Sequence, residues 1–322
     1  MKYIDIDLNG KSILITGGAG FIGSNVAFHI QENYPEAHIV IFDAFVLGHF
    51  KNLQGFKGEV IAGDITDPVA MQRLKAHKFD YIFHQAAISD TTALEQDIML
   101  KTNVNAYESL LKIAIKHNAN MIYASSAATY GDSDRFEVGY EKPNNVYGFS
   151  KVMMDNITYE YLKKDLNISI VGLKYFNVYG PREFYKNKTA SMVVQFGHQI
   201  LKGLTPKLFE GSDKILRDFI YIEDVIQANI KACNPKKSGV YNVGTGMARS
   251  FEDIVNILQK ELEIDNGKEY IPNPYIGQYQ FFTQANIETT KKNLGYEPKF
   301  SMEDGIIAYI PEIKRLFQEE VK

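Results

Sequence analysis

A glycine turn near the start of the chain most constrains what this sequence can fold into. Gly17, Gly20 and Gly23 follow the apolar run 12–16 and open a helical pattern over residues 21–33. In such a strand–turn–helix unit, the first glycine permits a tight turn and the second lets backbone N–H groups approach a pyrophosphate. The third allows the helix to pack closely on the strand. This context favours a dinucleotide site over a glycine-rich loop that binds nothing.

The first half of the chain alternates short apolar runs with helical patterns. Continuous apolar runs are typical of strands that are buried on both faces. Strands that alternate with helices predict an α/β fold with a parallel, doubly wound sheet of the Rossmann type. The expected strands are residues 12–16, 38–43, 59–62, 81–84, 121–124 and 169–174, and the longer expected helices are 21–33, 94–116 and 145–164.

Beyond residue 177 the pattern breaks into shorter pieces because proline and glycine interrupt it. We expect residues 1–176 to form a dinucleotide-binding domain, with return segments near 218–245. Residues 177–322 are expected to form mainly a smaller, irregular lobe that binds the substrate. Helical patterns persist there over residues 190–201, 223–232 and 251–262.

Composition and charge exclude several classes of partner and site. The formal net charge of −4 gives no global attraction for nucleic acid or anionic lipid. No apolar run approaches the roughly 20 residues that span a membrane, and the acidic residues after Met1 are unlike a signal peptide. The single cysteine, Cys233, fits a reducing compartment. We expect a cytoplasmic protein without a nucleic-acid or membrane partner. The spacing of its histidines predicts no metal.

Asp43 ends the second expected strand, some 20 residues beyond Gly23. A carboxylate there can accept hydrogen bonds from the adenosine ribose hydroxyls, which favours NAD. His49 and Lys51 in the following loop can instead pair with a 2′-phosphate and allow NADP, or Lys51 can be a solvated surface residue. The residues alone leave both cofactors open.

Tyr147 and Lys151 lie four positions apart in the helical pattern 145–164 and so share one face of a helix. The ammonium of Lys151 can favour the phenolate of Tyr147, whose ordinary pKa of about 10 is too high for a base at neutral pH. Ser125 and Ser126 follow the expected strand 121–124, at the edge where such sheets bind ligands. A serine there can hold a reacting hydroxyl or carbonyl, or it can cap the turn.

These motifs resemble those of the extended short-chain dehydrogenases/reductases, the superfamily of nucleotide-sugar epimerases and dehydratases. Within it, the sequence is similar to the ADP-glyceromanno-heptose 6-epimerases over nearly its whole length. The motif Tyr-Phe-Asn-Val-Tyr-Gly-Pro-Arg-Glu and the motif Phe-Glu-Gly-Ser are more discriminating than the glycine turn. The segments that carry the resemblance are residues 124–131, 145–151, 174–183, 207–212, 217–221 and 278–285.

The resemblance implies epimerisation of ADP-D-glycero-D-manno-heptose at C6, for the inner core of lipopolysaccharide. The C6 hydrogen is not acidic, so simple deprotonation cannot invert this centre. Oxidation by a nicotinamide dinucleotide removes the hydrogen as hydride, the exocyclic arm rotates, and the hydride returns to the opposite face. The cofactor ends unchanged, so we expect one tightly bound dinucleotide per subunit. The resemblance favours NADP over NAD and implies a homo-oligomer.

The resemblance also implies roles for individual residues. Tyr147 is expected to be one acid/base group, and Lys186, which follows Gly-Pro-Arg-Glu, to be the other. Partial desolvation would make the neutral amine of Lys186 accessible, whereas the alternative is an exposed loop lysine. Ser126 is expected to hold the C6 oxygen, and Lys151 to bond the nicotinamide ribose.

The remaining contacts follow from the same resemblance. Asp64 and Ile65 are expected beside the adenine, and Asn103 is expected to brace the site. Arg217 suits a diphosphate because its fork matches phosphate oxygens, although it can instead pair with Asp218. The other expected cofactor residues are Phe21, Ile22, Ala44, Gln85, Ala86, Ala87, Ser89 and Val178. The other expected substrate residues are Asn177, Lys188, Gln195, Phe209, Glu210, Gly211, Ser212 and Tyr279, of which Lys188 and Gln195 depart from the residue types common in the family.

Two other functions compete with this interpretation. A sugar-nucleotide 4-epimerase or 4,6-dehydratase would share the fold. A dehydratase normally needs an Asp-Glu pair where this chain has Ala127 and Ala128, which argues against elimination. A dinucleotide sensor without catalysis has no use for Ser126, Tyr147 and Lys151 together.

Overall fold

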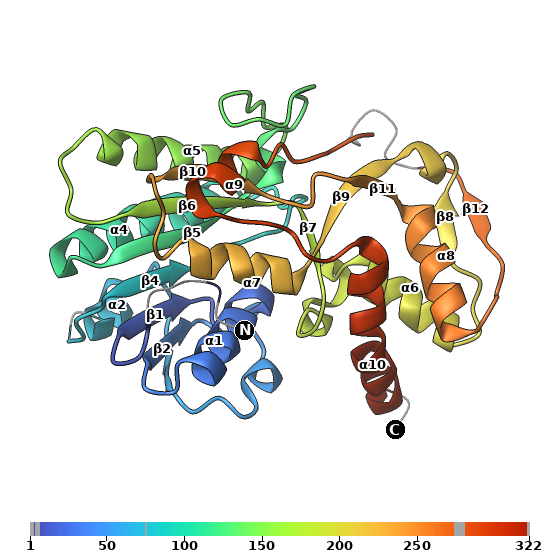
Figure 1. Cartoon of the computed structure of the whole chain (residues 1–322), viewed down its shortest axis with the longest axis horizontal. Helices are drawn as coiled ribbons and strands as arrows, with labels where there is room; N and C mark the ends of the chain where they lie inside the picture. The colour runs from blue at the N-terminus through green and yellow to red at the C-terminus, as the bar shows by residue number, and fades with distance from the viewer. Residues whose placement is uncertain (1–2, 4–6, 75, 274–280, 321–322) are drawn as a thin grey trace.

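A seven-stranded parallel sheet forms the larger lobe of the molecule (Figure 1). The computed structural model describes residue 3 and residues 7–74, 76–273 and 281–320. The strand order is β10-β6-β5-β4-β1-β2-β3, and each neighbouring pair is parallel, which confirms the predicted doubly wound sheet. The strands are β1 (Ser12–Thr16), β2 (His38–Asp43), β3 (Glu59–Ala62), β4 (Tyr81–His84), β5 (Asn120–Ser126), β6 (Ile170–Tyr175) and β10 (Gly239–Val243).

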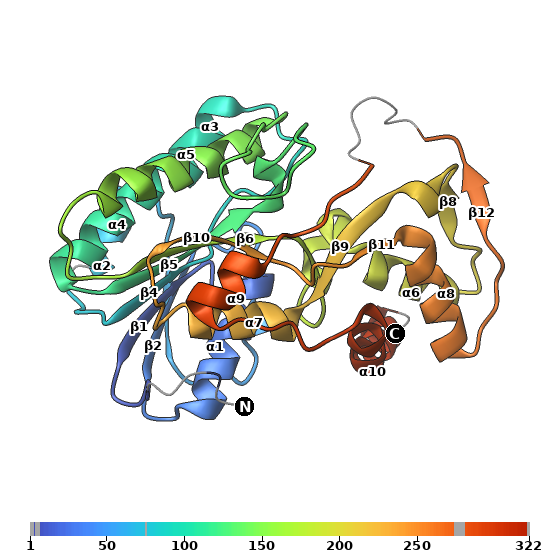
Figure 2. The same ribbon diagram turned by 45° about the horizontal axis from the view of Figure 1, so that its top comes forward.

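Helices cover both faces of this sheet, which explains the continuous apolar runs of its strands. Ile13 and Ile15 of β1 join a core cluster with α1 (Phe21–Asn33) and α7 (Ile222–Lys231). Leu14, between them, joins a second cluster on the opposite face. That face is covered by α2 (Pro68–Leu74), α4 (Ala106–His117) and α5 (Val146–Leu162), as Figures 1 and 2 show.

The smaller lobe is built from short pieces. It contains the three-stranded sheet β11-β9-β7 and the two-stranded sheet β12-β8. Its strands are β7 (Asn177–Tyr179), β8 (Lys207–Phe209), β9 (Leu216–Tyr221), β11 (Ala248–Ser250) and β12 (Glu269–Ile271), and its helices are α6 (Met192–Leu201), α8 (Phe251–Leu262) and α10 (Met302–Glu320).

Short 3₁₀ helices of three to six residues occur along the chain. They are η1 (Phe50–Leu53), η3 (Ala127–Thr129), η4 (Phe184–Thr189) and η5 (Ser212–Lys214).

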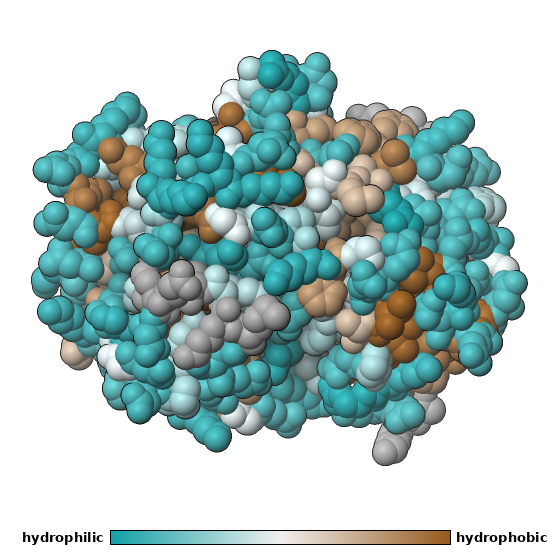
Figure 3. All heavy atoms as spheres, viewed as in Figure 1, coloured by the Kyte–Doolittle hydropathy of each residue, from teal (hydrophilic) through white to brown (hydrophobic). Residues whose placement is uncertain are grey.

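The chain returns to the larger lobe after β9. Helix α7 packs against α1, β10 extends the main sheet, and α9 (Glu288–Leu294) contacts β10. The assignment of residues 1–176 and 177–322 to two domains stays a prediction. Among the described residues no helix is long and apolar enough to cross a membrane. The face seen in Figure 1 is mainly hydrophilic (Figure 3).

The long helix expected over residues 94–116 is interrupted. The structure has α3 (Gln96–Leu100), a π-helical turn η2 (Lys101–Asn105), and then α4. Asn103 lies in that turn and is fully buried. Its amide accepts from Ile88 N at 2.9 Å and donates to Ile88 O and to Ser150 Oγ, both at 3.0 Å. These bonds account for the irregular turn, because they hold one side chain between two other segments.

A buried ion pair joins α5 to strand β6 of the main sheet. Lys174 of β6 is fully buried, and its Nζ lies 2.6 Å from Asp155 Oδ2 on α5. Asp155 also accepts hydrogen bonds from Tyr123 and Ser125 of β5 at 2.8 and 3.0 Å. Each charge therefore has partners that offset its loss of hydration.

We expect Asp155→Ala to destabilise the protein by about 3 kcal/mol, because it removes the nearer of the two carboxylates at the buried Lys174 ammonium and leaves Glu141 Oε1, at 3.1 Å, as the other. The double variant with Lys174→Met removes the buried ammonium as well and should recover part of that loss. Urea unfolding followed by circular dichroism measures both changes. A double variant as unstable as the single one would contradict this explanation.

Candidate active site

A cavity of about 650 Å³ opens at the carboxyl ends of the parallel strands. Its walls come from the segments that follow successive strands: the glycine turn after β1, the loop after Asp43 of β2, and Gln85–Ser89 after β4. The end of β5 and the segment after β6 complete it. Ligands of open α/β sheets bind at this edge, where helix N-termini also point.

The glycine turn fits the pyrophosphate of a dinucleotide. A Cβ on Gly17, whose φ is +70°, would lie 2.6 Å from Ala86 N. A Cβ on Gly23 would lie 2.3 Å from Gly17 O. Helix α1 begins directly after Gly20, and no side chain caps its N-terminus. Its first N–H groups therefore face the cavity beside a turn that only glycine permits.

Asp43 ties the glycine turn to the loop that follows β2. The Asp43 carboxylate is buried and accepts hydrogen bonds from Ala19 N at 2.9 Å and from Phe45 N at 2.7 Å. Burial raises its pKa, and these two backbone donors oppose that rise. Beyond Asp43 the cavity is lined by Ala44, Val46, Leu47 and Gly48. The described lining beside Asp43 thus contains no cation.

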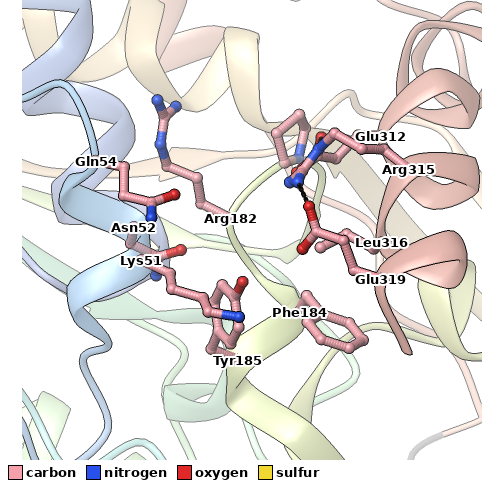
Figure 4. A pocket seen from close by; sticks show the side chains of 11 residues that line it. Lys51, Asn52, Gln54, Arg182, Phe184, Tyr185, Glu312, Arg315, Leu316 and Glu319 are labelled. Atoms are coloured by element: carbon pink, nitrogen blue, oxygen red, sulfur yellow. Dashed lines mark hydrogen bonds and ion pairs between the residues drawn. The ribbon is translucent and has the colours of Figure 1, made fainter. Parts of the chain in front are cut away.

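Lys51 lies in a different pocket, of about 630 Å³, between η1, the turn before η4 and α10 (Figure 4). Its Nζ lies 5.6 Å from the ring centroid of Tyr185, and the His49 ring stacks on the same tyrosine. Arg182 and an ion pair between Arg315 and Glu312 at 2.7 Å also line this pocket. The structure therefore separates Lys51 from the cavity of the glycine turn.

Tyr147, Lys151 and Ser126 meet in the cavity. Asn145 caps α5 by accepting from Gly148 N at 2.8 Å, so the helix begins one residue before Tyr147. The Lys151 ammonium donates to Ala124 O at 2.7 Å and lies 5.8 Å from the Tyr147 ring centroid. Burial lowers the pKa of Lys151 to about 8, and Asp155 opposes that shift. Burial raises the pKa of Tyr147, and its hydrogen bond with Ser126 opposes the rise.

Lys186 lines the same cavity from another segment, η4. Its Nζ lies 5.8 Å from the ring centroid of Phe21, the first residue of α1. Burial lowers the pKa of the Lys186 amine, so the exposed loop lysine considered above is not what the structure has. The four side chains expected to act in catalysis, including Ser126, Tyr147 and Lys151, therefore line one cavity.

The residues expected to bind the cofactor line this cavity, except Asn103, which lies behind Ile88. They are Gly17, Gly20, Phe21, Ile22, Gly23, Asp43, Ala44, Asp64, Ile65, Gln85, Ala86, Ala87, Ser89, Tyr147, Lys151, Val178 and Lys186. Sequence reasoning missed Val46 and Leu47, although they directly follow Asp43. It also missed Ile98 and Thr102, which reach the cavity only through the packing of α3 and η2 and carry no local signal.

The residues expected to bind the substrate are more scattered. Asn177 lines the cavity beside Ser126, and its amide donates to Asp218 O at 3.1 Å. The Asp218 carboxylate accepts hydrogen bonds from Thr245, Gly246 and Ala285. The others lie outside the lining of the cavity: Gln195 on α6, Phe209 at the end of β8, Glu210, Gly211, Ser212 in η5, and the buried Arg217 on β9. The side chain of Lys188 and all of Tyr279 lie outside the described part of the chain.

Residues 13–244 match the model of the NAD dependent epimerase/dehydratase family. The chain belongs to this family. The match confirms the predicted relationship to the extended short-chain enzymes and supports a nicotinamide dinucleotide as cofactor.

Solved structures of this family are similar over the whole chain. ADP-L-glycero-D-manno-heptose-6-epimerase of Helicobacter pylori shares 52% identity, with a TM-score of 0.90, over 98% of this chain and 99% of that one. UDP-glucose 4-epimerase of Thermotoga maritima shares 28% identity, with a TM-score of 0.86, over 97% and 100%. UDP-N-acetylglucosamine 4-epimerase of Methanobrevibacter ruminantium shares 25% identity, with a TM-score of 0.85, over 97% and 99%. The similarity to the heptose epimerase confirms the resemblance inferred from the motifs.

For this member of the epimerase/dehydratase family, the geometry agrees with an enzyme rather than a sensor. A sensor would need the glycine turn, but not a tyrosine, a serine and two lysines around one space. Among the described residues no group of three or more His, Cys, Asp or Glu side chains is arranged to hold a metal. The expectation that the protein uses no metal stays a prediction.

We expect Gly23→Ala to weaken NAD binding by at least about tenfold, or about 1.4 kcal/mol. Its Cβ would meet Gly17 O at 2.3 Å and force α1 away from the turn. Calorimetric titration of the dinucleotide-free protein measures this loss. Gly55→Ala is the control: it strains a positive φ, of +88°, which Gly23 does not have, but its Cβ meets nothing closer than 3.8 Å. Equal affinities for the Gly23 variant and the native protein would contradict the assignment of the turn.

Proposed function

We propose that this enzyme inverts C6 of ADP-D-glycero-D-manno-heptose to give the L-glycero epimer, which supplies heptose for the inner core of lipopolysaccharide. The observation that carries the proposal is the pair of acid/base side chains, Tyr147 and Lys186, on different walls of one cavity. The 52% identity to the H. pylori heptose epimerase supports the choice of substrate.

Different residues of the cavity would have different roles in the proposed reaction. A nicotinamide dinucleotide held by the glycine turn would supply the hydride acceptor and donor for C6. Ser126 holds the C6 oxygen by a hydrogen bond. Tyr147 and Lys186 serve the two orientations of the exocyclic arm: one takes the hydroxyl proton as the carbonyl forms, and the other returns a proton to that oxygen. Lys151 favours the phenolate of Tyr147 and bonds the nicotinamide ribose.

Burial acts in opposite directions on the pKa values of the two proposed acid/base groups. An ordinary lysine is almost wholly protonated at neutral pH, and an ordinary tyrosine is almost wholly neutral. Desolvation lowers the pKa of Lys186, so that its amine can accept a proton as well as donate one. Tyr147 needs a cation to form its phenolate, because desolvation acts in the opposite direction there.

The nucleotide part of the substrate is assigned to the smaller lobe. Arg217 and the segment Phe209–Ser212 would hold the diphosphate, and Asn177 would lie between cofactor and sugar. A cytoplasmic location and a homo-oligomeric state stay predictions.

We also propose that NAD, rather than NADP, is the tightly held cofactor, although the family resemblance favours NADP. A 2′-phosphate needs cationic partners near the adenosine ribose. The described lining beside Asp43 is apolar or carboxylate, and Lys51 lies in the second pocket (Figure 4). The Asp43 carboxylate would repel a phosphate but accept hydrogen bonds from a ribose hydroxyl.

The proposed reaction predicts C6 inversion without net formation of NADH. The protein is incubated with ADP-D-glycero-D-manno-heptose, the C6 configuration is followed by NMR, and absorbance at the nicotinamide band is recorded in parallel. We expect an equilibrium mixture of epimers and no lasting rise in absorbance. Unchanged substrate, with verified bound dinucleotide, would refute the proposed reaction.

The cofactor proposal predicts that the native protein binds NAD at least about tenfold more tightly than NADP. Calorimetry measures both affinities, and mass spectrometry identifies the dinucleotide released from the purified protein. Ala44→Lys should narrow the difference by adding a cation beside Asp43. Lys51→Met, the matched control, should leave both affinities unchanged. Preferential binding of NADP by the native protein would reverse our assignment.

A further inference from the structure

A single buried carboxylate closes the loop that carries Lys186. Glu183 is 1% exposed. Its Oε1 accepts hydrogen bonds from Gly180 N at 3.1 Å and from Ser191 Oγ at 2.8 Å, and its Oε2 accepts from Ser191 N at 2.6 Å. Gly180 follows the last residue of β7, and Ser191 precedes the first residue of α6. One side chain therefore joins the two ends of the loop 180–191.

Lys186 lies inside the loop that Glu183 closes. The backbone N of Lys186 donates to the backbone O of Glu183 at 2.9 Å, so the two residues are also joined directly. Phe184 and Tyr185, between them, line the second pocket (Figure 4), whereas Lys186 lines the dinucleotide cavity. Residues of this loop therefore line both the second pocket and the cavity of the glycine turn.

The same loop is anchored on the helix that follows the glycine turn. Arg182 has a φ of +72° and donates to Asn25 Oδ1 at 3.0 Å, while Asn25 donates back to Pro181 O at 2.9 Å. The Arg182 guanidinium also lies 4.1 Å from the ring centroid of Phe28. Because Asn25 and Phe28 belong to α1, the loop is held in a fixed position relative to the dinucleotide turn.

The charges of Glu183 and Lys186 act on each other. Burial raises the pKa of Glu183, and its hydrogen bonds and Lys186 oppose that rise. Burial lowers the pKa of Lys186, and Glu183 opposes that fall. The other titratable side chains that line the cavity are Asp43, Asp64, Tyr147, Lys151 and Tyr175.

We propose that Glu183 is a positioning residue for Lys186: it closes the loop 180–191 so that the amine is held against Phe21, and it supplies the negative charge that keeps the ammonium form accessible. Glu183 does not itself touch the reacting atoms. The proposal rests on the acid/base role proposed above for Lys186.

The test compares Glu183→Gln with Glu312→Gln. The first substitution keeps the shape of the side chain but removes its charge and one of its acceptor oxygens. Glu312 is a matched control, because it lines the second pocket next to the same loop and makes none of these contacts. We expect Glu183→Gln to lower kcat at least about tenfold, with KM and the affinity for NAD changed by less than about twofold. Glu312→Gln should leave all three unchanged.

A second readout does not depend on the reaction. The rate of acetylation of Lys186, measured by peptide mass spectrometry across a pH series, reports the fraction of free amine. We expect Glu183→Gln to move the midpoint of this titration to lower pH by about half a unit or more, because an opposing charge is lost. This titration needs no substrate. It therefore tests the effect of Glu183 on Lys186 even if the protein does not catalyse the proposed epimerisation.

A double variant distinguishes positioning from general stability. In a Lys186→Met background, Glu183→Gln should cause no further loss of activity, because the residue on which it acts is already absent. If Glu183→Gln fails to fold, Ser191→Ala removes one hydrogen bond and keeps the charge. It should lower kcat about two- to fivefold without moving the acetylation midpoint. An unmoved midpoint in Glu183→Gln, or an equal loss in both backgrounds, would overturn the proposal.

Discussion

The backbone of Gly17 lies against the backbone of Gln85 and Ala86, and Gly23 of α1 lies against Gly17. No side chain separates these three segments, and the cavity depends on that contact. It brings the N-terminus of α1 to the carboxyl ends of β1 and β4, where a pyrophosphate can meet backbone N–H groups. A methyl group at Gly23 would move the helix to which the Lys186 loop is anchored. The cofactor turn and the acid/base group are therefore mechanically connected.

Burial affects each of the groups proposed to act in catalysis. Lys151 donates to Ala124 O, and its Nζ lies 5.8 Å from the ring centroid of Tyr147. Lys186 lies on η4, and the charge of Glu183 opposes the effect of its desolvation. Two lysines in one cavity thus have different environments. Burial lowers the pKa of both amines, and Lys151 lies near Tyr147 whereas Lys186 lies near Phe21.

Local sequence patterns were sufficient for β1 to β6, for α1 and α5, and for the pairing of Tyr147 with Lys151, whereas the roles expected of Ser126 and Lys186 came from the family resemblance, and β10 was missed. A glycine turn and a Tyr-x-x-x-Lys pair are short, and their geometry follows from the helix or turn that contains them. Other features depend on contacts between distant segments. At the π-helical turn, Ile88 and Ser150 bind the amide of Asn103, and Lys51 lines the second pocket together with Tyr185. Hydrophobic periodicity along the sequence does not predict contacts between distant segments. The short strands of the smaller lobe also depend on such contacts and could not be predicted from the sequence.

In the proposed reaction, the hydrogen removed from C6 returns to the same molecule. A double-labelling experiment tests this with ADP-D-glycero-D-manno-heptose that carries deuterium at C6 and ¹³C elsewhere in the sugar, mixed with unlabelled substrate in ordinary water. We expect an epimeric product that keeps deuterium at C6 and only in the ¹³C-labelled molecules. Loss of deuterium to water would indicate proton abstraction, and its transfer to unlabelled molecules would indicate a hydride carrier shared between turnovers. Either result would show that the hydride does not return to the molecule from which it came.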